Sequence, residues 1–200
     1  MKPAPETRPV IEFPLPILGF SAFSGTGKTT LLTRLLPILK QQGLRIGAVK
    51  HAHHLFEVDH RQTDSYQLRK AGADQMLVAS RNRTALITEL QAPHKEPTLA
   101  ELLRALDPST LDLVLVEGFK KEHFPKIELH RPSLGKQLLY PDDPDIIAIA
   151  ADDHLATRPC HIPVLDLNQP DAIAGFLLSH CFQQQGQPSH LPPLLGQRRL

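Results

Sequence analysis

Cysteine is scarce in this chain, because Cys160 and Cys181 are its only two. They are too far apart for a CxxC redox motif or a zinc knuckle, so we expect reduced, packed thiols and no disulfide. Long hydrophobic runs are also lacking. No stretch approaches the roughly 18 apolar residues of a membrane span, and residues 1–16 carry prolines and charges instead of a signal-peptide core. These absences predict a cytoplasmic protein without a membrane partner.

An excess of charge of one sign is lacking as well. The chain has 22 basic and 21 acidic residues, for a formal net charge of +1, and shows no basic stripe. Nucleic acid is therefore not expected as a partner, and any phosphate group has to be bound by a local site. The 200 residues are 41% hydrophobic, which is ordinary for a globular protein with a sizeable core.

The most informative segment joins a strand-like run at 17–23 to a leucine-rich helical pattern. Between them the chain reads Ser24, Gly25, Thr26, Gly27, Lys28, Thr29, Thr30. This layout is typical of a P-loop, in which small residues let backbone N–H groups turn toward phosphates and the helix adds its positive end. We expect Lys28 to bind the β and γ phosphates and the Thr29 hydroxyl to bind Mg²⁺. Ala22 replaces the usual first glycine, so we expect strand-like backbone angles there.

Apolar runs alternate with helical patterns along the whole chain. Strands are predicted at 17–23, 44–50, 75–80, 84–88 and 111–117, and helices at 28–42, 64–71 and 98–106. Further apolar runs at 126–129, 146–150 and 164–167 precede a last helix at 171–184. The alternation predicts an α/β fold of the P-loop NTPase kind, a three-layer sandwich with a mostly parallel sheet and helices on both faces. We expect this domain to cover 16–184, between a flexible extension at 1–15 and a proline-rich tail at 185–200.

A carboxylate follows the strongly apolar run at 111–116. Glu117 stands where P-loop proteins place an acidic residue for Mg²⁺, opposite Thr29, and Gly118 would let backbone approach a phosphate. A solvated strand-end glutamate is the alternative. Asp152 and Asp153 follow the run at 146–150, from where a carboxylate could read the edge of a nucleotide base or simply cap a loop.

Histidine is concentrated after the second strand. The segment begins with Lys50 and His51 and continues with His53, His54, Glu57, Asp59 and His60. Such a cluster could hold a transition metal, although its spacing matches no fixed ligand template. We favour a loop whose first residues, Lys50 and His51, face the nucleotide or a second substrate, and a solvated loop remains the alternative. Asp64, three residues before Gln67, is predicted to be a helix N-cap, and the alternative is a role for Asp64 or Asp59 near Mg²⁺.

Several segments together resemble one known family. They are the P-loop, Lys50-His51 with the histidine-rich loop, the block from Asp64 to Ala73 (DSYQLRKAGA), the block from Val114 to Lys120 (VLVEGFK), and Pro125 to Glu128 (PKIE). Over about residues 15 to 182 the chain is similar to the molybdopterin-guanine dinucleotide biosynthesis adaptor family, MobB. The P-loop is shared by many families, whereas the block from Asp64 to Ala73, together with the block from Val114 to Lys120, is far more specific.

This resemblance implies a GTP-binding homodimer with weak GTPase activity. Members of the family assist the guanylyltransferase that attaches GMP to molybdopterin to form the guanine dinucleotide of the molybdenum cofactor, and molybdopterin itself is a further conceivable ligand. The roles of Gly25, Gly27, Lys28, Thr29 and Glu117 toward GTP and Mg²⁺ carry over by position. An NKxD guanine-reading motif is absent, and neither an arginine nor a glutamine is plainly placed for catalysis. At most a slow GTPase is therefore expected.

Two other functions share the P-loop. A nickel or zinc metallochaperone GTPase would bind its metal through the histidines from His51 to His60. Stoichiometric binding of Ni²⁺ or Zn²⁺ that is lost when those histidines are mutated would identify this function. A small-molecule kinase would prefer ATP and release a phosphorylated product.

Overall fold

The computed structural model describes residues 11–52, 56–90, 96–155, 159, 161–182 and 188. The chain forms two compact units, one from Met1–His51 together with Thr98–Leu200 and the other from Ala52–Pro97. The P-loop, Lys50, His51 and Glu117 all belong to the first unit. In the part of the chain that the structure describes, no helix has the length and apolar character needed to cross a bilayer.

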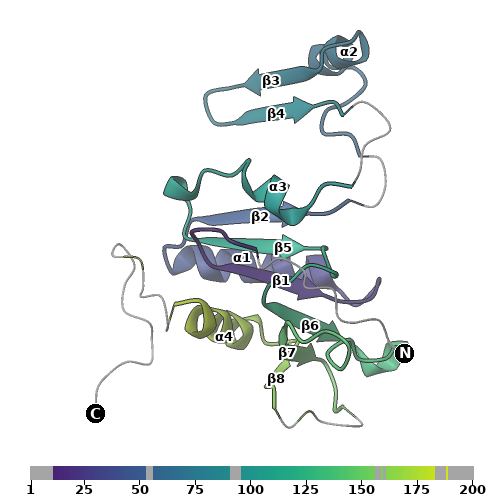
Figure 1. The fold of residues 1–200 in the computed structure, drawn as a ribbon, viewed down its shortest axis with the longest axis vertical. Helices are drawn as coiled ribbons and strands as arrows, with labels where there is room; N and C mark the ends of the chain where they lie inside the picture. The colour runs from purple at the N-terminus through teal and green to yellow at the C-terminus, as the bar shows by residue number, and fades with distance from the viewer. Residues whose placement is uncertain are drawn as a thin grey trace, which may run out of the picture. The chain divides into compact units, whose positions relative to one another are not determined.

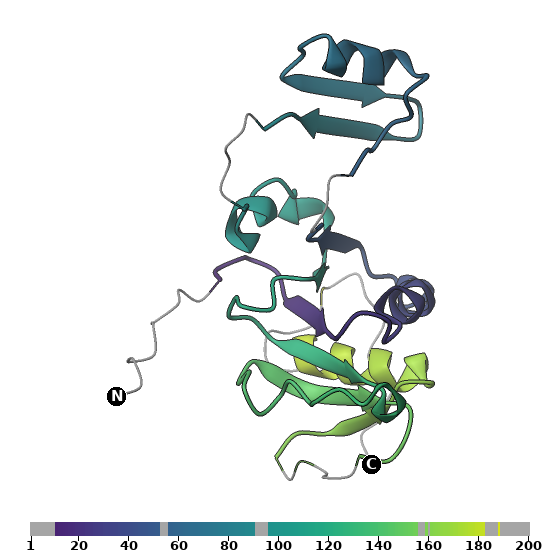
Figure 2. The same cartoon turned by 90° about the vertical axis from the view of Figure 1, so that its right-hand side faces the viewer.

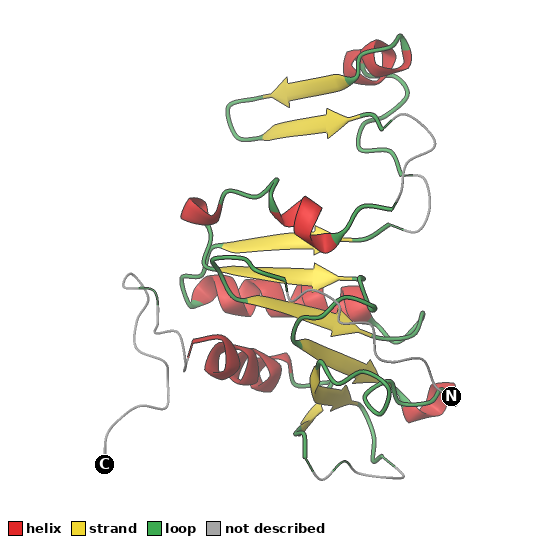
Figure 3. Cartoon of the chain, viewed as in Figure 1, coloured by secondary structure: helices red, strands yellow, loops and turns green. Residues whose placement is uncertain are grey.

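The first unit is built on a six-stranded sheet with the strand order β2-β5-β1-β6-β7-β8 (Figure 1). The strands are β1 (Ile17–Ser21), β2 (Ile46–Lys50), β5 (Leu113–Glu117), β6 (Lys126–His130), β7 (Ile146–Ala151) and β8 (Val164–Asp166). All neighbouring pairs are parallel, as the arrows of β2, β5, β1 and β6 illustrate (Figure 3). The predicted α/β fold with a mostly parallel sheet is therefore confirmed.

Helices cover the sheet on both faces. Helices α1 (Lys28–Gln41) and α4 (Pro170–Phe182) pack on one face, and the short α3 (Leu99–Leu103) packs on the other (Figure 2). Two 3₁₀ helices, Pro108–Thr110 and Pro132–Leu134, lie in connections. Helix α3 is shorter than the predicted 98–106 and begins with a capping box of Thr98 and Glu101.

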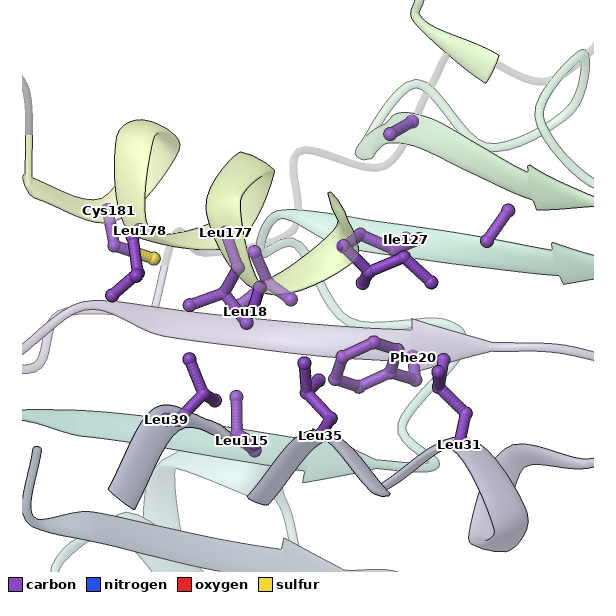
Figure 4. Packing of buried hydrophobic residues seen from close by; sticks show 14 of the residues in the cluster. Leu18, Phe20, Leu31, Leu35, Leu39, Leu115, Ile127, Leu177, Leu178 and Cys181 are labelled. Carbon is purple, nitrogen blue, oxygen red and sulfur yellow. The ribbon is translucent and has the colours of Figure 1, made fainter. Parts of the chain in front are cut away.

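The main core forms because apolar residues repeat on facing surfaces. Leu31, Leu35 and Leu39 recur every four residues and so share one side of α1, where they pack against Leu18 and Phe20 of β1 (Figure 4). Leu177, Leu178 and Cys181 of α4 join the same cluster. In β5 the run from Leu113 to Val116 is buried throughout, as expected for a central strand covered on both faces.

The register of the sheet brings the polar strand ends to one edge. Glu117 of β5 is level with Phe20 of β1 and with Lys50 of β2, while Ser21 of β1 is level with Glu128 of β6. The P-loop leaves β1 at this same carboxyl edge, which is where open parallel sheets collect ligands. Residues distant in sequence thus meet around the start of α1.

The second unit consists of α2 (Asp64–Lys70) and an antiparallel hairpin of β3 (Gln75–Ala79) and β4 (Thr84–Thr88). The hairpin forms a separate two-stranded sheet. The predicted N-cap at Asp64 was wrong, because the Thr63 hydroxyl accepts the hydrogen bond from the Tyr66 N–H and Asp64 is the first helical residue.

Candidate nucleotide-binding site

The P-loop is shaped by two glycines and by hydrogen bonds from Thr26, whose N–H and hydroxyl both donate to the Phe23 carbonyl. Gly25 and Gly27 have φ angles of 81° and 98°, which side chains with a Cβ rarely adopt. The buried Thr26 hydroxyl donates a 2.9 Å hydrogen bond to the Phe23 carbonyl and closes the loop on itself. Ala22 keeps a negative φ, as predicted from the missing first glycine. Thr26 therefore acts within the loop, and backbone groups remain to face a ligand.

The start of α1 has the features of an anion site. Gly27 is the N-cap and supplies no side-chain acceptor, and the first turn contains no acidic residue. The N–H groups of Lys28, Thr29 and Thr30 consequently lack the usual capping oxygen, while Ser24, Gly25, Thr29 and Thr30 are exposed. A fourteen-residue helix adds its positive end at this position. An oxyanion is the natural partner for such an arrangement.

Lys28 is held over the loop that precedes it. Its Nζ donates a 3.3 Å hydrogen bond to the Ala22 carbonyl, which spans the P-loop from its last residues to its first. The ammonium group thus lies among the loop's backbone groups, where phosphate oxygens could replace the single carbonyl as acceptors.

Glu117 stands at the end of β5 with its side chain only 19% exposed. Its carboxylate forms a 3.3 Å ion pair with the Lys50 ammonium from the neighbouring strand. A carboxylate and a threonine hydroxyl are oxygen donors of the type that Mg²⁺ prefers, so Glu117 and Thr29 are chemically suited to that ion.

Gly118 is required by a neighbour within the protein. A Cβ at Gly118 would lie 2.6 Å from the Cβ of His51, and the glycine has a φ of 104°. The His51 N–H donates a 2.9 Å hydrogen bond to the Glu117 carbonyl, and the His51 ring stacks on Phe119 with centroids 4.8 Å apart. Close packing against His51 explains this glycine without a bound phosphate. Lys50 and His51 therefore flank Glu117 directly.

Two further residues at the same edge, Arg131 and Lys120, were not assigned from the sequence. Arg131 follows β6, and its Nε donates a 2.8 Å hydrogen bond to the Thr26 carbonyl in the P-loop. Its Nη1 pairs with Asp152, which follows β7. Lys120 places its Nζ 5.4 Å from the centroid of the Phe23 ring. The rule that strand ends share one edge could have identified Arg131, but Lys120 depends on a turn that the sequence does not reveal.

Glu128 supports this edge from inside the sheet. Its fully buried carboxylate accepts hydrogen bonds from the backbone N–H groups of Leu139 and Tyr140, at 2.7 and 2.9 Å. Burial raises the pKa of this carboxyl, while the two N–H donors partly offset the effect. Glu128 thus fastens the connection between β6 and β7.

The histidine-rich segment does not form a metal site in the described part of the chain. His53 and His54 lie outside the described residues. Glu57 and Asp59 belong to the second unit, where both pair with the buried guanidinium of Arg69 together with Glu89. No group of three or more histidine, cysteine or carboxylate side chains suited to a metal occurs among the residues described.

Of the two cysteines, Cys160 lies outside the described residues. Cys181 is a free thiol in the core, and burial raises its pKa to about 12. At neutral pH it is therefore a packed, protonated side chain, as predicted.

Comparison with known proteins gives a consistent result. A family model described as "Molybdopterin guanine dinucleotide synthesis protein B" matches residues 17–152. The molybdopterin-guanine dinucleotide biosynthesis adapter protein of Escherichia coli K12 is 44% identical over 175 residues, covering 86% of this chain and 97% of that protein. The protein of the same name from Haemophilus influenzae is 39% identical over 163 residues, covering 82% of this chain and 88% of that protein.

Solved structures agree. The crystal structure of Bacillus subtilis MobB matches with a TM-score of 0.65 and 28% identity, covering 84% of this chain and 99% of that chain. A MobB homolog from Bacillus stearothermophilus matches with a TM-score of 0.60 and 26% identity, covering 82% of this chain and 97% of that chain. With a matching family model over most of its length and close relatives along nearly their whole sequences, this chain belongs to the MobB family.

Proposed function

We propose that this protein is a GTP-binding adaptor that assists a guanylyltransferase in converting molybdopterin cofactor to its guanine dinucleotide form. The observation that carries the proposal is the P-loop itself: a helix start without a capping side chain, adjoining the Lys28 ammonium. The names of the relatives, adapter proteins of molybdopterin-guanine dinucleotide biosynthesis, supply the pathway. Such a role is expected in the cytoplasm, where the nucleotide is available.

In this proposal the N–H groups of Gly25 and of the residues from Gly27 to Thr30 bind the phosphates, while the Thr26 N–H donates to the Phe23 carbonyl. Lys28 neutralises the β and γ phosphates, and Thr29 with Glu117 holds Mg²⁺ directly or through water. The Glu117–Lys50 ion pair keeps the carboxylate oriented before the ion arrives. The exposed Ser24 belongs to the same loop and is a further candidate contact for the nucleotide. His51 and Gly118 pack against each other and shape the backbone beside Glu117.

Hydrolysis should be slow in the isolated protein. Arg131 is the arginine that the structure brings to the loop, but its guanidinium is engaged by Thr26 and Asp152. An arginine held in this way is not available to stabilise the negative charge that develops on the phosphoryl group during its transfer. We therefore propose that nucleotide binding, rather than rapid turnover, serves the adaptor function.

The proposed partners are the guanylyltransferase and a second copy of the chain, with molybdopterin as a further candidate ligand. Light scattering at tens of micromolar would test the homodimer, and a monomer mass would exclude it. Mixing the chain with the guanylyltransferase in the presence of GTP or GDP would test for a complex. A complex that forms only with the triphosphate would favour a nucleotide-controlled adaptor.

The functional test is reconstitution of the guanine dinucleotide product from molybdenum-loaded molybdopterin, GTP and the guanylyltransferase. Adding the wild-type chain should increase product yield, and adding Lys28→Ala should not. Lys40→Ala is the matched control, because it removes an exposed lysine from the other end of the same helix. Equal yields with and without the wild-type chain would contradict the adaptor role. Consumption of ATP with a phosphorylated small-molecule product would instead identify a kinase.

A further inference from the structure

A left-handed turn after β5 has an unusual residue in it. Gly118 and Phe119 have consecutive positive φ angles of 104° and 52°, and Phe119 is the only non-glycine residue with positive φ among those described. A bulky aromatic residue rarely adopts this conformation, and such strain concentrates where function requires a particular geometry.

The surrounding structure holds the turn in place. Phe119 is 8% exposed and belongs to a core cluster with Val49 and Val116, and its ring stacks on His51. On the other side of the turn, His51 fills the space beside Gly118, so no larger residue fits there. The direction in which the chain leaves Phe119 is therefore fixed by packing.

This direction carries Lys120 back to the P-loop. The Lys120 Nζ lies 5.4 Å from the centroid of the Phe23 ring, and Phe23 is the P-loop residue directly after Ala22. The Lys28 Nζ donates to the Ala22 carbonyl. Two lysine side chains, one from α1 and one from the turn after β5, thus converge on the same short stretch of the loop.

Among the described residues, Lys120 forms no ion pair with an acidic side chain, although the negative charge of Glu128 acts on it. Burial, followed by the charge of Lys28, lowers the pKa of Lys120, and Glu128 raises it in part. Like charges brought together in this way are unfavourable until an anion binds between them.

We propose that Lys120 is a second phosphate-binding lysine, which contacts the terminal phosphate of a nucleoside triphosphate seated in the P-loop. The assignment to the terminal phosphate rests on the same turn: Glu117, the candidate magnesium ligand, is three residues before Lys120, and Mg²⁺ in P-loop proteins bridges the β and γ phosphates. The inference rests on the proposed nucleotide function. It adds that the turn from Glu117 to Lys120 distinguishes the triphosphate from the diphosphate.

The test compares affinities for a non-hydrolysable GTP analogue and for GDP, by calorimetry with Mg²⁺. Lys120→Met keeps the aliphatic stem beside Phe23 and removes the charge. It should weaken the triphosphate analogue about tenfold, the effect of one charge-assisted hydrogen bond, and change GDP by no more than about twofold. Lys120→Arg should retain most of the preference for the triphosphate. Lys121→Met removes a neighbouring lysine as a matched control and should leave both affinities unchanged.

The outcomes separate this inference from the proposed function. If Lys28→Ala abolishes binding while Lys120→Met binds both nucleotides like wild type, the P-loop function stands and the role of Lys120 is overturned. Equal weakening of both nucleotides by Lys120→Met would also overturn it, since a contact with the terminal phosphate cannot affect GDP. If the wild-type chain binds neither nucleotide, the proposed function itself fails. Unfolding curves of each variant establish that it is folded.

Discussion

The Arg131 Nε donates a 2.8 Å hydrogen bond to the Thr26 carbonyl, so the residue that directly follows β6 is fastened to the P-loop. The same guanidinium pairs with Asp152 after β7, and its Nη2 lies 3.5 Å from the position that a Cβ on Gly27 would take. Three neighbouring strand ends are thereby linked through one side chain. The loop is held in shape before any ligand arrives, which lowers the entropy that binding has to overcome.

Arg131→Ala should weaken nucleotide binding by about three- to tenfold, because the loop loses its donor at Thr26 and has to order on binding. Asp152→Asn, which removes the charge of the partner but keeps its shape, should have a smaller effect. Calorimetry with GTP measures both. Wild-type affinity in a folded Arg131→Ala protein would show that the loop needs no such support.

Glu117→Gln should reduce the dependence of GTP binding on Mg²⁺, because an amide is a much weaker magnesium ligand than a carboxylate. Titrations with Mg²⁺ and with a chelator give the ratio of affinities for each protein. Asp142→Asn, which alters an exposed carboxylate in the loop before β7, is the control and should behave as wild type. If Glu117→Gln keeps the wild-type ratio, Glu117 is a structural partner of Lys50 and no magnesium ligand.

Lys126 is 1% exposed and pairs with Asp143 at 3.1 Å and Asp145 at 3.5 Å, whose side chains are 19% and 23% exposed. Lys126→Met leaves carboxylates that water can reach, so we expect a loss of about 1–2 kcal/mol in the free energy of unfolding. The double change Asp143→Asn with Asp145→Asn removes both counter-charges of the buried ammonium, and should cost about 3–5 kcal/mol. Denaturant unfolding measures the free energy of unfolding of both variants. A larger loss for Lys126→Met than for the double change would mean that the ammonium finds other acceptors.

Burial lowers the pKa of His130 below its ordinary value of 6.5, and Asp152 only partly offsets this effect. The unfolded imidazole therefore takes up a proton at a higher pH than the folded one, so stability is full above about pH 6.5 and is lost as the pH falls below it. Urea unfolding at about pH 7.5 and 5.5 should show a smaller loss for His130→Gln than for wild type. Identical losses would mean that other groups account for the acid sensitivity.

The fold was largely predictable because it depends on local patterns. The uninterrupted apolar run ending at Val116 predicted a central strand, and the leucines spaced along α1 predicted the helix that covers it. The P-loop was predictable because its glycines, lysine and threonine are each required by backbone geometry or phosphate chemistry. The elements at the carboxyl edge followed from the rule that parallel strands end together.

The features that were missed depend on how side chains reach across the fold. Lys120 approaches Phe23 only because Phe119 adopts a left-handed conformation, for which its residue type is a poor indicator. Gly118 was predicted to face a phosphate, and the sequence did not reveal that its left-handed conformation and the packing of His51 also require a glycine there. The hairpin of β3 and β4 forms a separate antiparallel sheet, although its strands have the same apolar character as those of the main sheet.

The most direct test is a calorimetric titration of the wild-type chain and of Lys28→Ala with GTP and then ATP in the presence of Mg²⁺. The proposed function predicts saturable GTP binding to wild type that is tighter than ATP binding and that collapses in Lys28→Ala. Equal or tighter ATP binding, or GTP binding that survives the loss of Lys28, would contradict a GTP-dependent adaptor built on this P-loop.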